Sequence, residues 1–371
     1  MIIQNRSNVH QKNQRKARIF AFYLPQFHPI PENNEWWGQG FTEWTNVAKA
    51  KPLFKSHYQP RVPSTLSFYD LRLAETREAQ AELAKNHGVE GFVYWHYWFA
   101  GKRLLERPFN EVLSAKKPNF PFCLAWANES WTGIWHGNPG KILIEQTYPG
   151  VTDYEQHFYA LLEAFSDERY LKIEGKSIFY IYKPFDIPDV KVFIEKWNEL
   201  AKRNNISEFY FIARVNSEEE IRKSFELGYN AVQTNWLGFA MNKISYSKHF
   251  AIRALRKLTN NRYSLDVWDY GKLGPFLTHK IDQKTHHHPT ILTGWDNSPR
   301  SGTNGRILVN YTPDEFEKHL QRILEISKKK NPENNIIFLR SWNEWAEGNY
   351  IEPDLKFGHQ FLEKLKQNVM S

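Results

Sequence analysis

The chain has 371 residues, of which 41% are hydrophobic and 24% charged, and its formal net charge is +8 at pH 7. This length suits one large domain or two ordinary ones, and this composition is typical of a folded globular protein rather than a disordered one. The basic residues are dispersed and are not interleaved with aromatic residues as in single-strand binders, so we expect no nucleic acid partner. An anionic glycan or an anionic lipid surface remains compatible with the charge.

The sequence predicts no membrane span, no secretion signal and no disulfide. No segment approaches about 18 consecutive apolar residues, and residues 1–17 are polar and basic without the apolar core of a signal peptide. Cys123 is the single cysteine, which excludes an intramolecular disulfide. We therefore expect a cytoplasmic monomer with a basic tail over residues 1–17, while peripheral contact with a membrane stays open.

Short runs rich in β-branched and aromatic residues recur along the chain and predict strands. In chain order they span residues 18–24, 89–98, 121–128, 177–184, 209–216, 229–236, 290–297 and 335–344. Amphipathic stretches between and after them predict helices over 69–88, 105–117, 152–170, 188–205, 216–228, 247–258, 312–330 and 358–370. The sixth connection is the least regular, because its helix is followed by a long irregular stretch to about residue 289.

This alternation of strands and helices predicts a parallel sheet covered by helices. Eight such units close into a (β/α)8 TIM barrel, here with long βα loops. An open, doubly wound sheet is the alternative, but it usually has fewer strands and a glycine-rich first turn, and no GxGxxG or GxxxxGK[ST] motif occurs. We therefore predict one α/β catalytic domain over residues 18–371.

Polar and aromatic residues gather where each predicted strand ends, which in a TIM barrel is the face that carries the active site. Aromatic rings stack on the apolar faces of sugars, while amide, imidazole, guanidinium and carboxylate groups fix hydroxyls by hydrogen bonds. We therefore expect an oligosaccharide or polysaccharide substrate. The candidate substrate-binding residues are His28, Glu43, Trp44, Trp95, His96, Trp126, Asn128, Glu129, Trp131, Arg214, Trp236, Trp295, Asp296, Arg300 and Asn343.

Glu344 and Glu347 are the sharpest candidates for catalysis. They lie in the segment SWNEWAEG, at the end of the last predicted strand. Acid–base chemistry at a glycosidic bond needs two carboxyl groups in different protonation states, and a tryptophan-walled site raises the pKa of one of them. The alternative is that both are solvated loop residues, or that Glu344 accepts backbone hydrogen bonds.

Other kinds of chemistry have weaker support in the sequence. The histidines at 286–288 could bind a metal, but no second ligand cluster accompanies them, and they precede Pro289 in a predicted loop. A GxSxG nucleophile elbow is absent, and Cys123 lies inside a predicted strand without an evident histidine partner. We expect no metal and no cofactor.

Four segments resemble the signature blocks of a known family: YLPQFHPIPENNEWWGQGFTEWTNV, WANESWT, GWDNSPR and WNEWAEGNYIEPD. They look like those of the WbsX-type proteins of bacterial O-antigen and capsule polysaccharide gene clusters, which are similar to glycoside hydrolase family 99, the endo-α-mannosidases and endo-α-mannanases. The resemblance runs from Arg18 to about Phe361. It implies a (β/α)8 barrel and retaining, endo-acting hydrolysis or transglycosylation of an α-linked glycan.

The resemblance also implies a role for each glutamate. In family 99 the substrate's own 2-hydroxyl replaces the enzyme nucleophile through a 1,2-anhydro sugar, which is a known exception to the two-carboxylate scheme. Glu344 would then be the base for that hydroxyl, and Glu347 the acid for the leaving oxygen and later the base for water. Ala346 stands where the family has a histidine, which puts a preference for mannose in doubt.

The main alternative function is glycosyl transfer in O-antigen or capsule biosynthesis, since WbsX-type proteins are also labelled glycosyltransferases. An enzyme that uses nucleotide sugars usually needs a diphosphate cradle or an acidic pair that binds a metal. The chain has neither a DxD motif nor a glycine-rich phosphate loop, so we favour hydrolysis or transglycosylation. A non-catalytic glycan-binding barrel is the third alternative.

Overall fold

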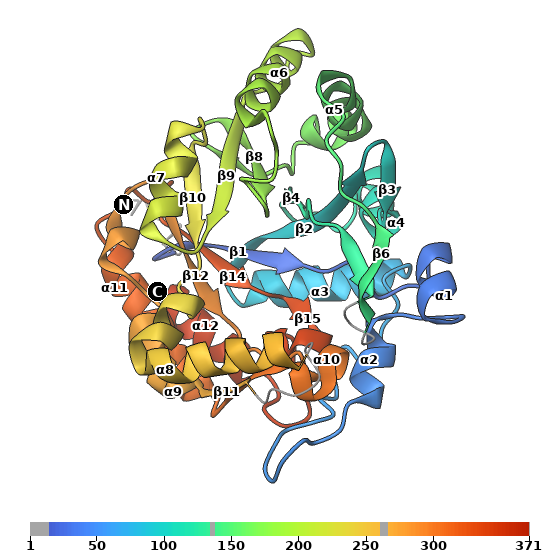
Figure 1. Cartoon of the computed structure of the whole chain (residues 1–371). Helices are drawn as coiled ribbons and strands as arrows, with labels where there is room; N and C mark the ends of the chain where they lie inside the picture. Colours follow the sequence, from blue (N-terminus) through green and yellow to red (C-terminus); the bar gives the residue numbers. More distant parts are fainter. Residues whose placement is uncertain (1–14, 134–137, 260–265, 371) are drawn as a thin grey trace, which may run out of the picture.

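Parallel strands close into an eight-stranded barrel in the computed structural model, which describes residues 15–133, 138–259 and 266–370 (Figure 1). Around the barrel the order is β1, β2, β4, β8, β9, β10, β12, β14, and β1 pairs with both β14 and β2 to close the ring. These strands are β1 (Arg18–Tyr23), β2 (Val89–Phe99), β4 (Phe122–Trp126), β8 (Lys176–Ile181), β9 (Phe209–Val215), β10 (Ala231–Thr234), β12 (His287–Leu292) and β14 (Ile336–Arg340). The predicted strands and the predicted (β/α)8 class are confirmed.

Helices surround the barrel, as Figure 1 shows. They are α3 (Ala74–Asn86), α4 (Arg107–Ala115), α5 (Val151–Phe165), α6 (Val190–Arg203), α7 (Glu218–Glu226), α8 (Leu237–Leu258), α11 (Pro313–Ser327) and α12 (Gln360–Val369). Each lies within or overlaps a predicted helical stretch. The helix α8 begins at Leu237, ahead of the predicted residue 247, because two helical segments join across a kink at Ser245, where φ is −160° and ψ is 90°.

The βα loops carry short elements of their own. The first loop holds α1 (Pro31–Trp37) and α2 (Glu43–Lys49), and later βα loops hold β3 (Lys102–Leu104), β5 (Trp131–Gly133), β6 (Asn138–Ile144), α10 (Ser298–Ser301), β15 (Asn343–Glu344) and β16 (Asn349–Tyr350). The short strand β7 (Lys172–Ile173) lies instead between α5 and β8. These loops are long, as predicted, and the candidate site is built from them.

The prediction of an irregular stretch after α8 is wrong for the part that the structure describes. This part contains β11 (Asp266–Asp269), α9 (Tyr270–Leu273) and two 3-10 turns (Gly274–Phe276 and Lys280–Gln283). The strand β11 pairs in parallel with β13 (Arg306–Val309), and Arg306 Nε donates to Asp266 Oδ2 at 2.8 Å. Four-residue strands that pair outside the main sheet leave little periodic signal in a sequence.

The prediction that the three consecutive histidines lie in a loop is also wrong for two of them. His287 and His288 begin β12, and both are buried. Tyr210 Oη lies 3.0 Å from His286 Nδ1 and 3.4 Å from His288 Nε2, and burial lowers the pKa of His288 well below its usual value. Within the described ranges, no group of three or more His, Cys, Asp or Glu side chains is arranged to hold a metal ion.

The two ends of the described chain lie side by side, since Arg15 forms an antiparallel bridge with Met370. Most of the predicted basic tail, residues 1–14, lies outside the described residues. In the ranges that are described, no helix is both long and apolar enough to cross a membrane. Cys123 is fully buried in β4, where burial raises the pKa of its thiol.

Candidate active site

A cavity of about 280 Å³ lies at the carboxyl ends of the barrel strands. Its walls come from the ends of β1, β2, β4, β8, β12 and β14 and from the loops that follow these strands. They are Leu24, Gln26, Trp37, Trp95, Tyr97, Ala127, Glu129, Ser130, Trp131, Thr132, Leu143, Tyr182, Trp295, Arg300, Arg340, Ser341, Glu344 and Glu347. This is the face at which TIM barrels carry their active sites.

Several residues that the sequence singled out meet in this cavity. They are the proposed catalytic pair and five of the candidate substrate-binding residues: Glu344, Glu347, Trp95, Glu129, Trp131, Trp295 and Arg300. They come from segments far apart in the chain, so closure of the barrel brings them together.

Arg300, on α10, is bonded to three carboxylates at the floor of the cavity. Its Nη1 donates to Glu347 Oε1 at 2.6 Å, and its Nη2 lies 2.9 Å from Glu43 Oε2 and 3.4 Å from Glu344 Oε2. Glu43, the first residue of α2, is fully buried and lies behind the cavity wall rather than in it. One guanidinium therefore serves three acidic groups, and its charge cannot neutralise all of them.

Burial and the charges of neighbouring acidic groups raise the pKa of Glu344 and that of Glu43. Burial, and next the negative charge of Glu347, raise the pKa of Glu344 to about 8, against the opposing effect of Arg300. Burial also raises the pKa of Glu43, although Arg300 lowers it. Glu344 therefore holds a proton at pH 7. Because only 8% of Glu344 is exposed, the alternative that it is a solvated loop residue does not hold.

The turn from Asn343 to Tyr350 fixes both proposed catalytic glutamates. Asn343 pairs with Tyr350, and Glu344 with Asn349, in the short antiparallel pair β15–β16. The ring of Trp345 stacks on Tyr350 with centroids 3.8 Å apart, and its Nε1 donates to Glu352 Oε2 at 2.6 Å. Ala346 is fully buried and does not line the cavity. The carboxylates are thus carried by a turn whose other side chains are packed inward.

Aromatic rings build the cavity walls and are held by their neighbours. Trp95 stacks on Phe22, with centroids 4.8 Å apart and planes 11° apart. Arg340 lies over the ring of Trp295 at 4.8 Å. Trp131 meets Tyr97 edge to face at 5.0 Å. Rings fixed in this way present their remaining surface to a ligand at little further cost in conformational entropy.

Two predicted residues in strands point away from the cavity. His96 lies with its Nε2 2.8 Å from His157 Nε2, and burial lowers the pKa of both histidines. Trp126 is fully buried and packs edge to face on His157 at 4.7 Å. Since successive strand residues face opposite sides of a sheet, His96 and Trp95 cannot both face the barrel axis.

Other predicted residues support the loops around the site. Asn343 accepts a hydrogen bond from Leu24 N at 2.7 Å and donates to Leu24 O at 3.1 Å, which joins the ends of β14 and β1. Asn128 Nδ2 donates to Lys183 O at 2.8 Å, which joins the ends of β4 and β8. Trp44 Nε1 donates to Tyr69 O at 2.7 Å. The described residues that line the cavity do not include these three side chains.

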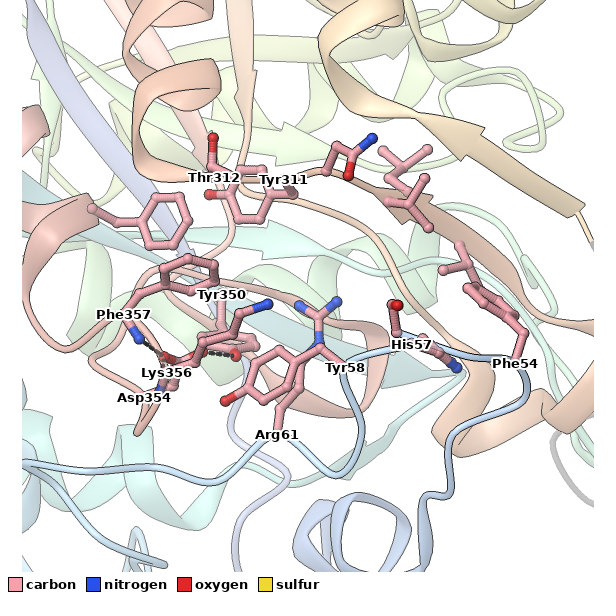
Figure 2. A pocket seen from close by; sticks show the side chains of 16 residues that line it. Phe54, His57, Tyr58, Arg61, Tyr311, Thr312, Tyr350, Asp354, Lys356 and Phe357 are labelled. Carbon is pink, nitrogen blue, oxygen red and sulfur yellow. Dashed lines mark hydrogen bonds between the residues drawn. The ribbon is translucent and has the colours of Figure 1, made fainter.

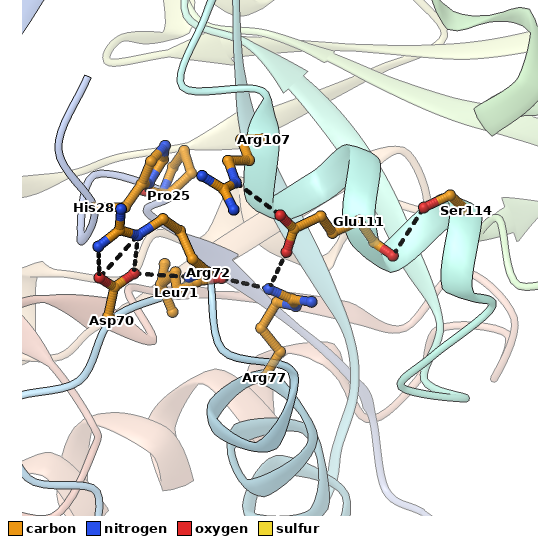
Figure 3. A network of polar contacts seen from close by, with 9 residues as sticks. All are labelled: Pro25, His28, Asp70, Leu71, Arg72, Arg77, Arg107, Glu111 and Ser114. Atoms are coloured by element: carbon orange, nitrogen blue, oxygen red, sulfur yellow. Dashed lines mark hydrogen bonds and ion pairs between the residues drawn. The ribbon is translucent and has the colours of Figure 1, made fainter. Parts of the chain in front are cut away.

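Four further candidates lie outside the cavity wall. The Arg214 guanidinium lies over the ring of Tyr182, 4.5 Å from its centroid, and Tyr182 lines the cavity. Trp236 Nε1 donates to Asp282 Oδ2 at 2.9 Å, and Asp296 accepts from Gln59 Nε2 at 2.7 Å. His28 is buried beside the Asp70–Arg72 ion pair, and its Nδ1 lies 2.9 Å from Pro25 O (Figure 3).

Sequence reasoning missed Gln26, Tyr97 and Arg340 as cavity residues. Tyr97 could have been found, because it lies two residues after Trp95 on the same face of β2. Arg340 could also have been found, because it is the last residue of β14 and precedes the proposed catalytic pair closely in the sequence. Gln26 has no comparable signal, because it lies in a loop without periodicity.

A family model and two curated relatives match nearly the whole chain. The family model described as Glycosyltransferase WbsX matches residues 19–365. Two curated relatives, each described as uncharacterized protein WxcX and each from a strain of Xanthomonas campestris pv. campestris, are 35% identical over 353 residues. The match covers 95% of this chain and 49% of theirs, so the chain spans about half the length of the curated relatives it matches.

Solved structures share the barrel at low sequence identity. A glycoside hydrolase-like protein matches with a TM-score of 0.61 and 12% identity, over 100% of this chain and 98% of that one. The family 99 endo-alpha-mannosidase from Bacteroides thetaiotaomicron matches with a TM-score of 0.52 and 14% identity, over 94% of this chain and 96% of that one. At these identities the likeness shows the fold alone.

Proposed function

The chain belongs to the WbsX family, and on that premise we propose that it is a retaining, endo-acting glycoside hydrolase or transglycosylase. Its substrate in this proposal is an α-linked bacterial surface polysaccharide or the oligosaccharide precursor of one. The enzyme in this proposal is a monomer and acts in the cytoplasm. The observation that carries the proposal is the position of Glu344 and Glu347 in one aromatic-walled cavity, joined by Arg300. The family 99 fold likeness supports it.

In the proposed reaction the sugar's 2-hydroxyl attacks its own anomeric carbon and forms a 1,2-anhydro sugar. Glu344 takes the proton of that hydroxyl, and Glu347 protonates the departing glycosidic oxygen. In the second step Glu347 takes a proton from water, water attacks the anomeric carbon, and Glu344 returns the proton to the 2-oxygen. Inversion at each step gives net retention of configuration.

The experiment that tests this proposal uses bacterial surface polysaccharides as substrates and identifies products by mass spectrometry. We expect Glu344→Gln and Glu347→Gln each to lose roughly 100-fold or more in cleavage rate, the usual scale for acid–base groups. The matched control is Glu163→Gln on the exposed face of α5, which should cleave at the wild-type rate. Wild-type cleavage by either glutamine variant of the pair would remove that residue from the mechanism.

Glycosyl transfer from a nucleotide sugar is the second candidate, favoured by the description of the family model. It predicts release of a nucleoside diphosphate from an activated donor, which a coupled assay detects. A non-catalytic glycan-binding barrel would instead show a glycan-dependent rise in melting temperature with neither cleavage nor transfer, because a ligand of the native state stabilises it.

A further inference from the structure

A second cavity, of about 340 Å³, lies next to the turn that carries Glu347, and Figure 2 shows the side chains that line it. Its walls come from three segments, residues 54–61, 307–312 and 350–361. Arg61 Nη1 donates to the carbonyl of Gly348 at 3.1 Å, so one of its wall residues is bonded directly to the turn. None of its lining residues belongs to the first cavity.

Aromatic rings and cations alternate along this second cavity. The Lys356 ammonium lies 4.7 Å from the ring centroid of Tyr58 and 4.9 Å from that of Phe357. The Arg61 guanidinium lies 5.8 Å from Tyr58 and 5.7 Å from Tyr350. In Figure 2, Tyr311 and Thr312 lie across the cavity from Tyr58 and Arg61. Such a wall offers both apolar faces for stacking and positive charge.

The carboxylates near this cavity already accept hydrogen bonds from several donors of the protein. Asp354 accepts from Tyr350 Oη at 2.7 Å and from the backbone N–H groups of Lys356 and Phe357. Asp296 accepts from Gln59 and Ser298 and lies 2.8 Å from His57 Nε2. Its Oδ2 also lies 3.5 Å from Arg61 Nη2, which is the longest of these contacts and leaves Arg61 Nε without a partner among the described residues. Because Leu53 N donates to His57 Nδ1, the Nε2 of the ring is the nitrogen that donates to Asp296.

Three polar groups of the cavity wall lack a matching partner. Arg61 Nε and Tyr311 Oη are buried without a hydrogen-bond partner among the residues described. The Lys356 side chain is exposed, and its ammonium forms no ion pair with a carboxylate of the described residues. Buried donors without partners are costly, so their presence points to a ligand that accepts hydrogen bonds.

We propose that this cavity is a second binding site, for a sugar residue that carries an acidic group. The aromatic rings would stack on the apolar face of the pyranose, while Lys356 and Arg61 receive the carboxylate or phosphate. Ser56, Asn310 and Thr312 add hydroxyl and amide groups at the wall, which suit a polyhydroxylated ring. The site does not depend on the proposed hydrolysis, since binding there needs no catalysis.

The test measures binding of D-glucuronate, glucose 6-phosphate and neutral glucose by saturation-transfer NMR on the full chain. We expect both acidic sugars to bind at least 10-fold more tightly than glucose. Lys356→Ala should weaken their binding about 10-fold, and Lys356→Arg should restore it. Lys191→Ala, an exposed lysine on α6, is the charge-matched control and should bind as the wild type does.

Variants of the first cavity separate the two sites. Trp131→Ala removes a ring of the first cavity and should leave glucuronate binding unchanged, whereas Tyr58→Ala should weaken it. The proposal is overturned if glucuronate does not bind at about 10 mM, if glucose binds equally well, or if Lys356→Ala has no effect. Lys356-dependent binding of uridine monophosphate in preference to the acidic sugars would overturn the choice of ligand.

Discussion

Glu344 is the residue whose protonation decides how the proposed reaction runs. Its pKa of about 8 means that it is protonated at pH 7, yet a base must be free of its proton to accept another. Arg300 lowers this pKa and the charge of Glu347 raises it. The pH profile therefore tests whether the active pair of carboxyl groups carries one proton.

Because the proposed reaction needs one ionised and one protonated carboxyl group, we expect kcat/KM to fall as pH rises through about 8, where Glu344 loses its proton. The fall is the same whichever of the two glutamates is the acid, because the profile reports the proton count of the pair. The measurement is kcat/KM from pH 5 to pH 10 with a soluble oligosaccharide, since this ratio reports the groups of the free enzyme. A flat profile between pH 7 and pH 9 would contradict this requirement.

The same raised pKa means that Glu344 lowers the free energy of unfolding at neutral and alkaline pH. In the unfolded chain this side chain ionises above about pH 4.5, whereas in the fold it keeps its proton up to about pH 8. The folded state therefore binds more protons in this window, and its stability falls as pH rises from about 4.5 to 8. Glu344→Gln removes the titration, so it should stabilise the protein on the order of a few kcal/mol at pH 8.

Thermal unfolding at pH 4.5 and pH 8 measures this effect. The difference between Glu344→Gln and the wild type should be near zero at pH 4.5 and largest at pH 8. Glu163→Gln on α5 should show no such dependence on pH. Equal melting temperatures for Glu344→Gln and the wild type at pH 8 would mean that the folded protein accommodates the ionised carboxylate without cost.

At the scale of elements, the pleat of β2 explains which predicted site residues reached the cavity. Sequence reasoning placed Trp95 and His96 at the same rim, but a strand sends neighbouring side chains to opposite faces. Trp95 and Tyr97 face the cavity, while His96 pairs with His157 under α5. Periodicity was thus sufficient to locate the strand and, applied residue by residue, could have chosen between these side chains.

The long βα loops were harder to predict from sequence. Helix α8 crosses a kink at Ser245, and β11 pairs with β13 only because distant segments meet on the outside of the barrel. Neither feature has a local pattern, because both depend on tertiary packing. The same holds for Arg300, whose position between three carboxylates follows from the path of the loop after β12.

The turn after β14 gives a prediction at this scale, through Gly348. Its φ is +55°, and a Cβ added there would lie 2.7 Å from Asp296 Cβ and 2.9 Å from Asp296 N. Gly348→Ala should therefore displace the turn, misplace Glu347 and lower kcat on the order of 10- to 100-fold, as small errors of position can do. Strain and clash together should also cost roughly 2 kcal/mol or more.

Gly358→Ala is the matched control for Gly348→Ala. Gly358 has a similar φ of +53°, but nothing lies within 4 Å of an added Cβ. It should therefore lose only the cost of a left-handed backbone, about 1 kcal/mol, and keep the wild-type kcat. Similar loss of kcat in both variants would show that backbone strain, rather than the contact with Asp296, explains the effect.

At the scale of the whole molecule, barrel closure places Glu43, Arg300 and Glu344 in one cluster. The sequence predicted that the strand ends meet, which is a property of any TIM barrel. It could not predict which of the polar residues near those ends face inward, because loops of this length have many possible paths. The fold was therefore more predictable than the site.

The overall charge gives the last prediction, which concerns the long-range approach of substrate. A chain of net charge +8 attracts an acidic polysaccharide, and salt screens that attraction beyond a Debye length of about 10 Å at 0.1 M. For an acidic polymer that is cleaved, we expect KM to rise at least about 3-fold between 50 and 500 mM NaCl, with kcat nearly unchanged. A neutral polymer of similar length should show no such rise. Equal salt dependence for the two polymers would mean that the positive charge does not guide substrate to this barrel.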